Sequence, residues 1–234
     1  MLLLKIPKQK KLSTAGVSLD ELDEPFVDIA SFSGGAIVAD MKYADAGRPG
    51  AIRTAYVRLG VAERLIRAAS LLPSGYKLKV YDTWRPYTVQ KSIYDEYFDS
   101  LRALPENADK STDELHALAR RYVSYPEENK RLSYVHSSGG AVDLTIIDAE
   151  GRELDMGSGF DEFSPFSALD ALEGTNTPAE ENRRLLYTVM TDCGFTPFGE
   201  EWWHYDYGDL FWAATLGVNA IYPSAYREEE LNVR

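Results

Sequence analysis

The chain has 234 residues, 44% of them hydrophobic, which is enough for one sizeable core or two small ones. Its formal net charge of −12 argues against a nucleic-acid partner, because phosphate binding needs clustered Lys and Arg, and against an anionic membrane surface. No apolar run approaches the roughly eighteen residues of a membrane span, and the three leucines at 2–4 are too few for a secretion signal. The one cysteine, Cys193, cannot form an intrachain disulfide, and we expect it to be buried and inert. These features predict a cytoplasmic protein.

The predicted elements follow in irregular order along the chain. Residues 1–25 are polar, first Lys-rich and then acidic, and predict an arm ahead of one domain at 26–234. Apolar residues spaced by three and four predict helices, and alternation predicts strands. Helices are expected at 61–72, 86–104, 112–122 and 178–192, and strands at 76–81, 140–147 (with a short return strand after a turn at 148–151) and 202–207. This order predicts a single α+β domain with a central antiparallel sheet and flanking helices.

Two of the three histidines lie close to carboxylates in the sequence. His136 precedes a Ser-Ser-Gly-Gly segment that can turn sharply, and Asp143 lies within the strand that follows. Alternation along that strand places Ala141, Asp143 and Thr145 on one face. The glycines let the backbone bring His136 beside Asp143, and zinc accepts a His nitrogen and an Asp oxygen at about 2.0–2.2 Å. The two residues are therefore candidate metal ligands.

The segment from Glu200 to His204 offers a third ligand and a base. His204 can bind the metal, and either Glu200 or Glu201 can reach the metal's water; spacing does not choose between them. Positions i and i+3 of a regular strand point to opposite faces, so we expect a bulge, a strong twist or a strand end between Glu201 and His204. Three ligands leave the fourth tetrahedral position to water, which is typical of a catalytic zinc site.

Other interpretations of these residues remain open at this point. A histidine is more often solvated, or a hydrogen-bonded core residue, than a metal ligand, and Trp202 and Trp203 can simply be core aromatics. The third histidine, His116, lies on a predicted helix one turn after Asp113. We expect His116 to make a hydrogen bond on the helix surface and to bind no metal.

Two ordered motifs, His-x6-Asp and further along Glu-x-Trp-His, resemble those of the D-alanyl-D-alanine dipeptidases of the vancomycin-resistance type. These are zinc D,D-peptidases that share a fold with the hedgehog signalling domain. The resemblance covers most of the chain, from about Phe26 to Trp212. It includes Met41 to Ala44, Tyr81 to Pro86, His136 to Leu144, Met156 to Asp161, Asn182 to Leu185 and Glu201 to His204. It implies a zinc cleft on one face of the sheet.

The resemblance also implies a role for each residue of the two motifs. His136, Asp143 and His204 match the ligands of one zinc ion per chain. Glu201, and not Glu200, matches the general base that takes a proton from water and gives it to the leaving amine.

Three residues outside the motifs match substrate contacts. Arg85 matches an arginine that steadies the substrate carbonyl as it becomes an oxyanion; the alternative is a structural salt bridge with Asp82, and both can hold. Tyr43 and Asp161 match residues that receive the free ammonium of a dipeptide. The alternative for Asp161 is a solvated acidic loop shared with Glu162.

Two segments depart from the family pattern. Tyr134 and Val135 stand where the family has Ser-Ser before the first histidine, and the serine side chain helps to bind the C-terminal carboxylate of the substrate. The segment at 45–50 replaces the family's Asn-Phe-x-Gly. We hypothesise that Arg48 or Arg53 supplies the missing carboxylate contact.

The expected function is zinc-dependent hydrolysis of a small dipeptide, D-Ala-D-Ala or a similar short peptide with a D-configured C-terminal residue. The nearest alternative is a zinc D,D- or L,D-carboxypeptidase acting on cell-wall peptides, which would tolerate an N-terminal extension; Asp161 separates the two. A non-enzymatic, zinc-stabilised interaction module is the alternative from another class, and it would have no need of Glu201 or Arg85.

Overall fold

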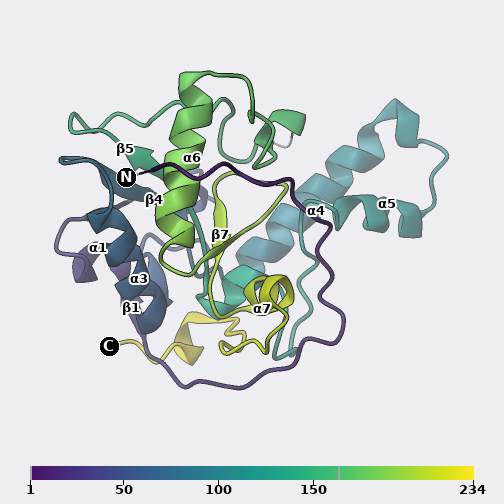
Figure 1. The fold of residues 1–234 in the computed structure, drawn as a ribbon. Coiled ribbons are helices and arrows are strands. Elements are labelled where there is room, and N and C mark those ends of the chain that lie inside the picture. The colour runs from purple at the N-terminus through teal and green to yellow at the C-terminus, as the bar shows by residue number, and fades with distance from the viewer. Residues whose placement is uncertain (1, 163) are drawn as a thin grey trace.

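The computed structural model describes residues 2–162 and 164–234, and Figure 1 shows their arrangement. The α-helices are α1 (Ile29–Phe32), α2 (Lys42–Asp45), α3 (Leu59–Ser70), α4 (Tyr87–Ala103), α5 (Thr112–Ala119), α6 (Pro178–Thr191) and α7 (Leu210–Leu216). The strands are β1 (Phe26–Asp28), β2 (Ile37–Ala39), β3 (Tyr56–Arg58), β4 (Lys77–Asp82), β5 (Ala141–Ile147), β6 (Thr196–Pro197) and β7 (His204–Asp206). Single 3-10 turns are η1 (Pro105–Asn107), η2 (Val135–Ser138), η3 (Pro165–Ser167) and η4 (Glu228–Glu230).

The main sheet has the strand order β2-β4-β5-β7-β6, and a small second sheet pairs β1 with β3. The expected α+β class is confirmed. The sheet is antiparallel except at one edge, where β2 runs parallel to β4. The chain leaves β2, forms β3 and α3, and then returns as β4, and such a crossover lets two neighbouring strands run in the same direction. The predicted antiparallel sheet is thus mixed, with one parallel pair of strands at this edge.

One face of the sheet is covered by α3 and α6, which lie in front of it in Figure 1. On β5, the side chains of Val142, Leu144 and Ile146 are fully buried in this layer. Each buried aliphatic side chain of this size contributes about 1.5–3 kcal/mol of hydrophobic stabilisation. Because side chains alternate along a strand, Asp143 projects from the opposite face of β5. That opposite face carries the candidate site.

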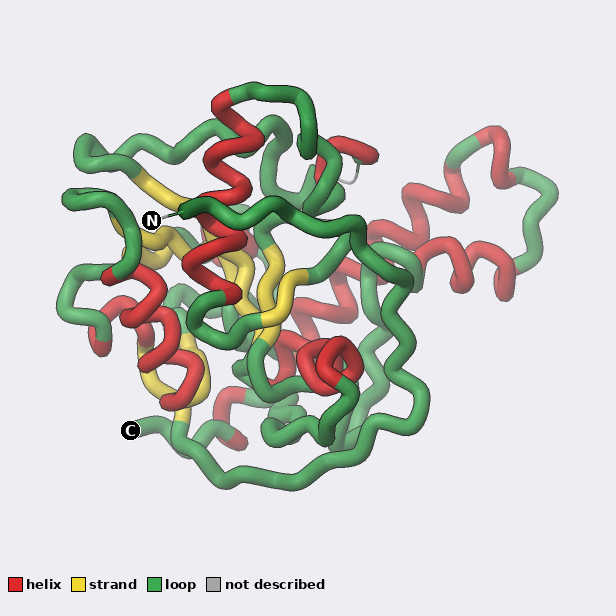
Figure 2. Tube along the Cα trace, viewed as in Figure 1, coloured by secondary structure: helices red, strands yellow, loops and turns green. Residues whose placement is uncertain are grey.

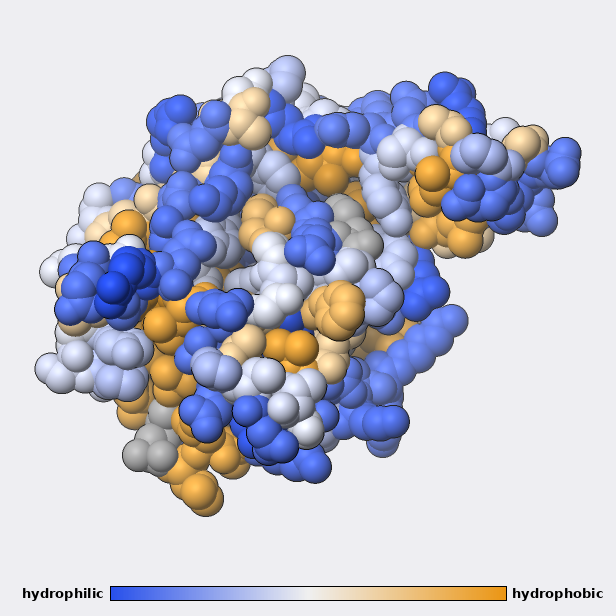
Figure 3. Space-filling view, turned by 90° about the horizontal axis from the view of Figure 1, so that it is seen from above, coloured by the Kyte–Doolittle hydropathy of each residue, from blue (hydrophilic) through white to orange (hydrophobic). Residues whose placement is uncertain are grey.

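The α4–α5 hairpin projects from the body of the molecule, as the tube in Figure 2 shows. It has a small apolar cluster of its own, made of Val89, Ile93, Tyr94, Ala119 and Val123. Viewed from above, the hairpin stands out at the right with both apolar and polar atoms on its surface (Figure 3). Among the described residues, no helix combines the length and the hydrophobicity needed to cross a lipid bilayer.

Helix α5 ends at Ala119, three residues before the predicted end at 122. The helix begins with a capping box in which Ser111 and Glu114 exchange hydrogen bonds. After Ala119 the chain tightens, because the amide of Arg121 bonds to the carbonyl of Leu118 three residues back. The apolar pattern continues into this turn, so that spacing alone could not locate the end of the helix.

The first described residues, 2–25, run across the front of α6 and around the base of the molecule (Figure 1). Ile6 is buried, and its amide donates to a carboxylate oxygen of Glu173 at 2.9 Å. Leu19 forms a β-bridge with Ala220. The division of the chain into an arm and a domain stays a prediction, and the residues assigned to the arm pack along the domain.

Candidate metal centre and substrate pocket

Three elements bring the predicted metal ligands together. His136 lies in η2, Asp143 on β5, and His204 at the start of β7. The register of β5 and β7 pairs Asp143 directly with His204, so that their side chains are cross-strand neighbours. The turn that holds His136 ends at Gly139, which has a φ of 73° and lies so close to the ring of Phe26 that a Cβ there would overlap it. The glycines of this segment are therefore required, as the sequence indicated.

The three side chains form one compact, buried cluster. The Asp143 carboxylate lies between the two rings, with Oδ1 2.9 Å from His204 Nδ1 and Oδ2 3.4 Å from His136 Nε2. One potential ligand atom from each residue lies within 4.8 Å of the others. Tetrahedral ligands at about 2.1 Å from a zinc ion would be about 3.4 Å apart, so the cluster has the spacing that a metal requires.

Each histidine is held by one ring nitrogen while the other faces Asp143. His136 Nδ1 lies 2.7 Å from the carbonyl oxygen of Thr83, and His204 Nε2 lies 2.8 Å from Oδ1 of Asp206. Such outer contacts fix the orientation of the ring in metal sites and direct the free nitrogen to the ion. Two imidazoles and one carboxylate also suit zinc chemically.

Electrostatics keep Asp143 in the form that a metal binds. Burial opposes ionisation, but His136 and His204 outweigh it and hold the pKa of the Asp143 carboxyl well below its usual value. A ligand carboxylate must be ionised, so this side chain is prepared for a cation.

Glu201 lies in the turn before β7, and its side chain lines the same pocket as the three ligands. The amide of Glu201 donates to the carbonyl of Phe198, and β7 begins at His204. The strand end expected between Glu201 and His204 is thus confirmed. Burial raises the pKa of the Glu201 carboxyl to about 8. Glu200 instead has a side chain that is 43% exposed and pairs with Arg121 at the surface.

Arg85 is buried and makes the salt bridge with Asp82 that the sequence offered as one alternative. Its Nε donates to Asp82 at 2.7 Å, and a terminal nitrogen donates to the amide oxygen of Gln90 at 2.6 Å. Another terminal nitrogen lies 3.5 Å from Oδ2 of Asp143 and 3.5 Å from the hydroxyl of Tyr43. Burial lowers the pKa of Arg85, but Asp82, Tyr43 and Asp143 outweigh it, so the guanidinium stays charged. It lies beside the metal cluster and also lines the pocket.

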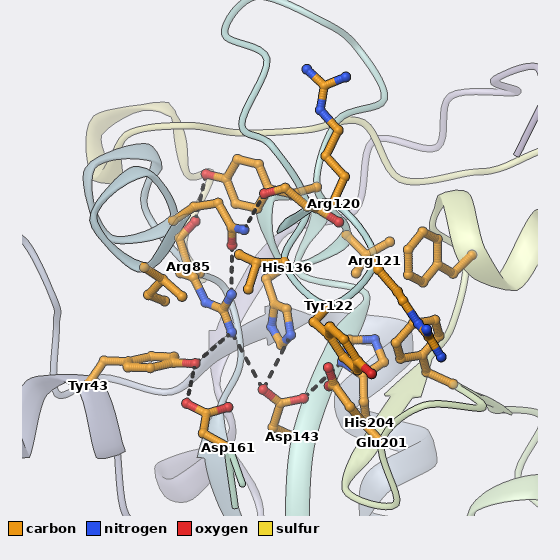
Figure 4. Close-up of a pocket in the computed structure, with 18 residues that line it drawn as sticks. Tyr43, Arg85, Arg120, Arg121, Tyr122, His136, Asp143, Asp161, Glu201 and His204 are labelled. Atoms are coloured by element: carbon orange, nitrogen blue, oxygen red, sulfur yellow. Dashed lines mark hydrogen bonds and ion pairs between the residues drawn. The ribbon is translucent and has the colours of Figure 1, made fainter. Parts of the chain in front are cut away.

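Tyr43 and Asp161 meet at one end of the pocket, where the Tyr43 hydroxyl donates to Asp161 at 2.8 Å (Figure 4). The backbone of Asp161 has a φ of 56°, a left-handed conformation that is uncommon for a residue other than glycine. Burial, assisted by the charge of Asp143, raises the pKa of the Asp161 carboxyl to about 6. Glu162 is the exposed member of this acidic pair, and it accepts a hydrogen bond from the amide of Gly159.

The loop that carries Asp161 is fixed by Arg183 of α6. The buried Arg183 guanidinium donates to the carbonyl oxygens of Met156, Phe166 and Ala168 at 2.6, 2.6 and 2.7 Å. These carbonyls lie on both sides of Asp161 in the chain. The sequence indicated Arg183 only as part of a matching segment, and its contacts depend on the fold.

The side chains before the first ligand do not replace the family's serine pair. Tyr134 is buried, and its hydroxyl donates to the backbone carbonyl of Arg85 at 2.9 Å. Val135 lines the pocket but has no polar atom in its side chain. Arg48 and Arg53 do not line this pocket: Arg48 donates to Glu96 at 2.6 Å, and Arg53 pairs with Asp45 at the surface. The hypothesis that either arginine supplies the carboxylate contact has no support in these positions.

His116 lies away from the metal cluster, as expected. Its partner is the hydroxyl of Tyr94, 2.7 Å from Nδ1, and not Asp113. The ring also stacks on Phe98 in the hairpin. The helix pattern could not show this contact, because Tyr94 belongs to the neighbouring helix α4.

The pocket also has a wall that the sequence did not reveal. It is formed by residues after the end of α5, by one residue of α4, by one from the segment between β6 and β7, and by one of α7. The additional lining residues are Ile93, Arg120, Arg121, Tyr122, Val123, Ser124, Phe198 and Phe211. In Figure 4, Arg121 and Tyr122 of this wall lie on the opposite side of Asp143 from Asp161 and Tyr43.

The sequence model of the D-ala-D-ala dipeptidase family, Peptidase M15, matches residues 51–226. This chain belongs to that family. The matched range contains every predicted site residue except Tyr43. The family expected from the motifs is confirmed.

Among relatives of the D-ala-D-ala dipeptidase family, a D-alanyl-D-alanine dipeptidase of Synechocystis sp. is 28% identical over 218 residues, 84% of this chain and 87% of that protein. A D-alanyl-D-alanine dipeptidase of Escherichia coli is 34% identical over 134 residues, 57% of this chain and 56% of that protein. Among solved structures, the vancomycin-resistance D,D-pentapeptidase VanY in complex with Zn(II) aligns with a TM-score of 0.41 at 18% identity, over 71% of this chain and 83% of that chain.

Proposed function

We propose that this chain is a zinc-dependent dipeptidase that hydrolyses D-Ala-D-Ala. The observation that carries the proposal is one pocket that holds a buried His-Asp-His cluster, a half-buried carboxyl at Glu201 and a second half-buried carboxyl at Asp161. Family membership and the names of the relatives support the choice of substrate.

His136 Nε2, Asp143 and His204 Nδ1 would hold the zinc ion. When bound, zinc polarises the substrate carbonyl and lowers the pKa of water to about 7. Arg85 adds a fixed positive charge beside the cluster, where negative charge develops on the carbonyl oxygen during attack. Its bonds to Asp82 and Gln90 keep the guanidinium in place, so little reorganisation is needed in the transition state.

Glu201 would act as the general base and then as the general acid. Its carboxyl removes a proton from the attacking water and gives it to the amine that leaves. A pKa near the working pH suits both transfers, and burial moves the pKa of Glu201 in that direction.

Asp161 and Tyr43 would bind the free ammonium group of the substrate. A buried carboxylate facing a buried ammonium forms a strong, charge-assisted hydrogen bond. An N-acylated substrate offers no charge to Asp161 and brings bulk to that end of the pocket. The geometry therefore favours a dipeptidase over a carboxypeptidase that acts on longer wall peptides.

The test is amine release from D-Ala-D-Ala and from N-acetyl-D-Ala-D-Ala by the zinc-loaded protein, with Glu201→Gln as the control. We expect turnover of the free dipeptide alone, and loss of turnover in the variant. Efficient cleavage of the acetylated substrate would replace the proposal with a carboxypeptidase. One bound zinc per chain without hydrolysis of either substrate would support a non-enzymatic module.

A further inference from the structure

A dipeptide carries an ammonium at one end and a carboxylate at the other. Asp161 offers a counter-charge to the ammonium, and the carboxylate needs a cationic partner. With the ammonium at Asp161 and the scissile carbonyl beside Arg85, the second residue must extend past the metal cluster. Two extended residues span about 7 Å. The carboxylate of the substrate would then face the wall formed by the end of α5 and by Phe198 and Phe211.

Two arginines from the end of α5 belong to this wall, and they differ in direction. In Figure 4 the guanidinium of Arg120 points away from the metal cluster, whereas that of Arg121 lies on the side of His204 and Glu201. Each guanidinium also lies over a neighbouring ring, 5.2 Å from its centroid, Arg120 over Tyr125 and Arg121 over Tyr122, so the direction of the side chain is what separates them. Arg121 is therefore the better placed of the two to meet a substrate.

Apart from its contact with the ring of Tyr122, Arg121 is weakly engaged by the protein. Among the described residues, Glu200 is the carboxylate that it pairs with, and their closest atoms are 3.9 Å apart, too far for a hydrogen bond. Its side chain is 63% exposed. By contrast, Arg85 and Arg48 each donate to a neighbouring side chain at 2.6 Å. The planar guanidinium of Arg121 thus keeps donors for a carboxylate, which it can bind through two parallel hydrogen bonds.

We propose that Arg121 binds the free C-terminal carboxylate of the dipeptide substrate. In this chain it takes the task that the Ser-Ser pair has in the related enzymes, since Tyr134 is bonded to the backbone of Arg85 and Val135 is apolar. The inference rests on the proposed function. This assignment makes the enzyme selective for substrates charged at both ends, because Asp161 binds the ammonium and Arg121 binds the carboxylate.

The test compares D-Ala-D-Ala with D-Ala-D-Ala amide, which lacks the carboxylate. Binding of each to zinc-loaded protein carrying Glu201→Gln is measured by calorimetry, with and without Arg121→Ala. We expect Arg121→Ala to weaken binding of the acid about tenfold or more, as for a lost hydrogen bond to a charged group, and to leave binding of the amide unchanged. Arg121→Lys keeps the positive charge but lacks the planar guanidinium that donates two parallel hydrogen bonds. Its loss of affinity for the acid should be intermediate.

Two neighbouring substitutions serve as matched controls. Arg120→Ala removes a cation of the same wall that points away, and Glu200→Gln removes the one carboxylate paired with Arg121. Both should leave binding of the acid within about twofold of the parent protein or, for Glu200→Gln, slightly tighter. In the active enzyme, Arg121→Ala should raise KM for D-Ala-D-Ala with kcat unchanged.

Failures of the two proposals can be told apart. Turnover of D-Ala-D-Ala by the parent enzyme, together with equal binding of acid and amide or an unchanged affinity in Arg121→Ala, overturns the assignment of Arg121 alone. No binding and no turnover of either compound overturns the dipeptidase function and the assignment with it.

Discussion

Asp161→Asn should weaken binding of the substrate and, at the same time, raise the free energy of unfolding. The substitution keeps the size of the side chain and its ability to accept a hydrogen bond from Tyr43, but it removes the charge. Loss of one partner from a buried charge pair costs about 2–5 kcal/mol, so KM for D-Ala-D-Ala should rise at least about thirtyfold.

The gain in stability follows from the pKa of Asp161. Burial raises it from 3.8 to about 6, and each pKa unit corresponds to about 1.4 kcal/mol. Because the folded state binds this proton more tightly than the unfolded state, the free energy of unfolding falls as the pH rises from about 4 to about 6. At pH 7 the ionised carboxylate therefore destabilises the metal-free protein by about 3 kcal/mol, and Asn removes this penalty.

The assay is urea unfolding of the metal-free protein and its variant at pH 7 and at pH 4, combined with steady-state kinetics of the zinc-loaded forms. The variant should be the more stable protein at pH 7, and the difference should disappear at pH 4. For the parent enzyme, KM should rise as the pH falls through the pKa of Asp161, which burial raises, since protonated Asp161 has no charge for the ammonium. A stable variant with an unchanged KM would refute the role in substrate binding, and equal stability at pH 7 would refute the electrostatic reasoning.

Three further substitutions test the rest of the site. Glu201→Gln should lower kcat about 10²–10⁴-fold while one zinc per chain remains bound, as measured by metal analysis. Asp206→Asn removes the partner of His204 Nε2 and should weaken zinc binding about 10–100-fold in competition with a chelator; unchanged affinity would contradict its orienting role. Arg183→Met should lower the free energy of unfolding by about 3 kcal/mol and raise KM, because three carbonyls of the Asp161 loop, one buried and two partly buried, lose their donor.

The sequence predicted the long elements well and the short ones poorly. Helices α3, α4 and α6 and strands β4 and β5 lie within two residues of their predicted bounds, because each is long enough to show a period. Strands β1, β2 and β3 have three residues each, too few for a period to be visible. The predicted return strand after 148–151 is only a bridge between Ile147 and Glu153, and the predicted strand at 202–207 is reduced to β7.

The metal cluster could be predicted in part from local patterns and in full only from the resemblance of the two motifs to a known family. The glycines after His136 and the alternation around Asp143 indicated a close pair, and the spacing of Glu201 and His204 indicated a bulge, a strong twist or a strand end. Asp206 was missed although a signal was present. It lies two residues after His204, and residues i and i+2 of a strand project from the same face. The place of Arg121 had no local signal, because it depends on how the hairpin packs against the sheet.

The hairpin of α4 and α5 gives this enzyme two separately stabilised parts. The metal ligands rest on β5, β7 and the turn beside them, whose apolar face belongs to the main core. Arg121 and its neighbours follow a helix held by a different, smaller cluster. Substitutions at the end of α5 can thus alter which leaving residue is accepted, while Gln90 at the base of α4 still holds Arg85 in place. Selectivity and chemistry are free to evolve at different rates within one chain.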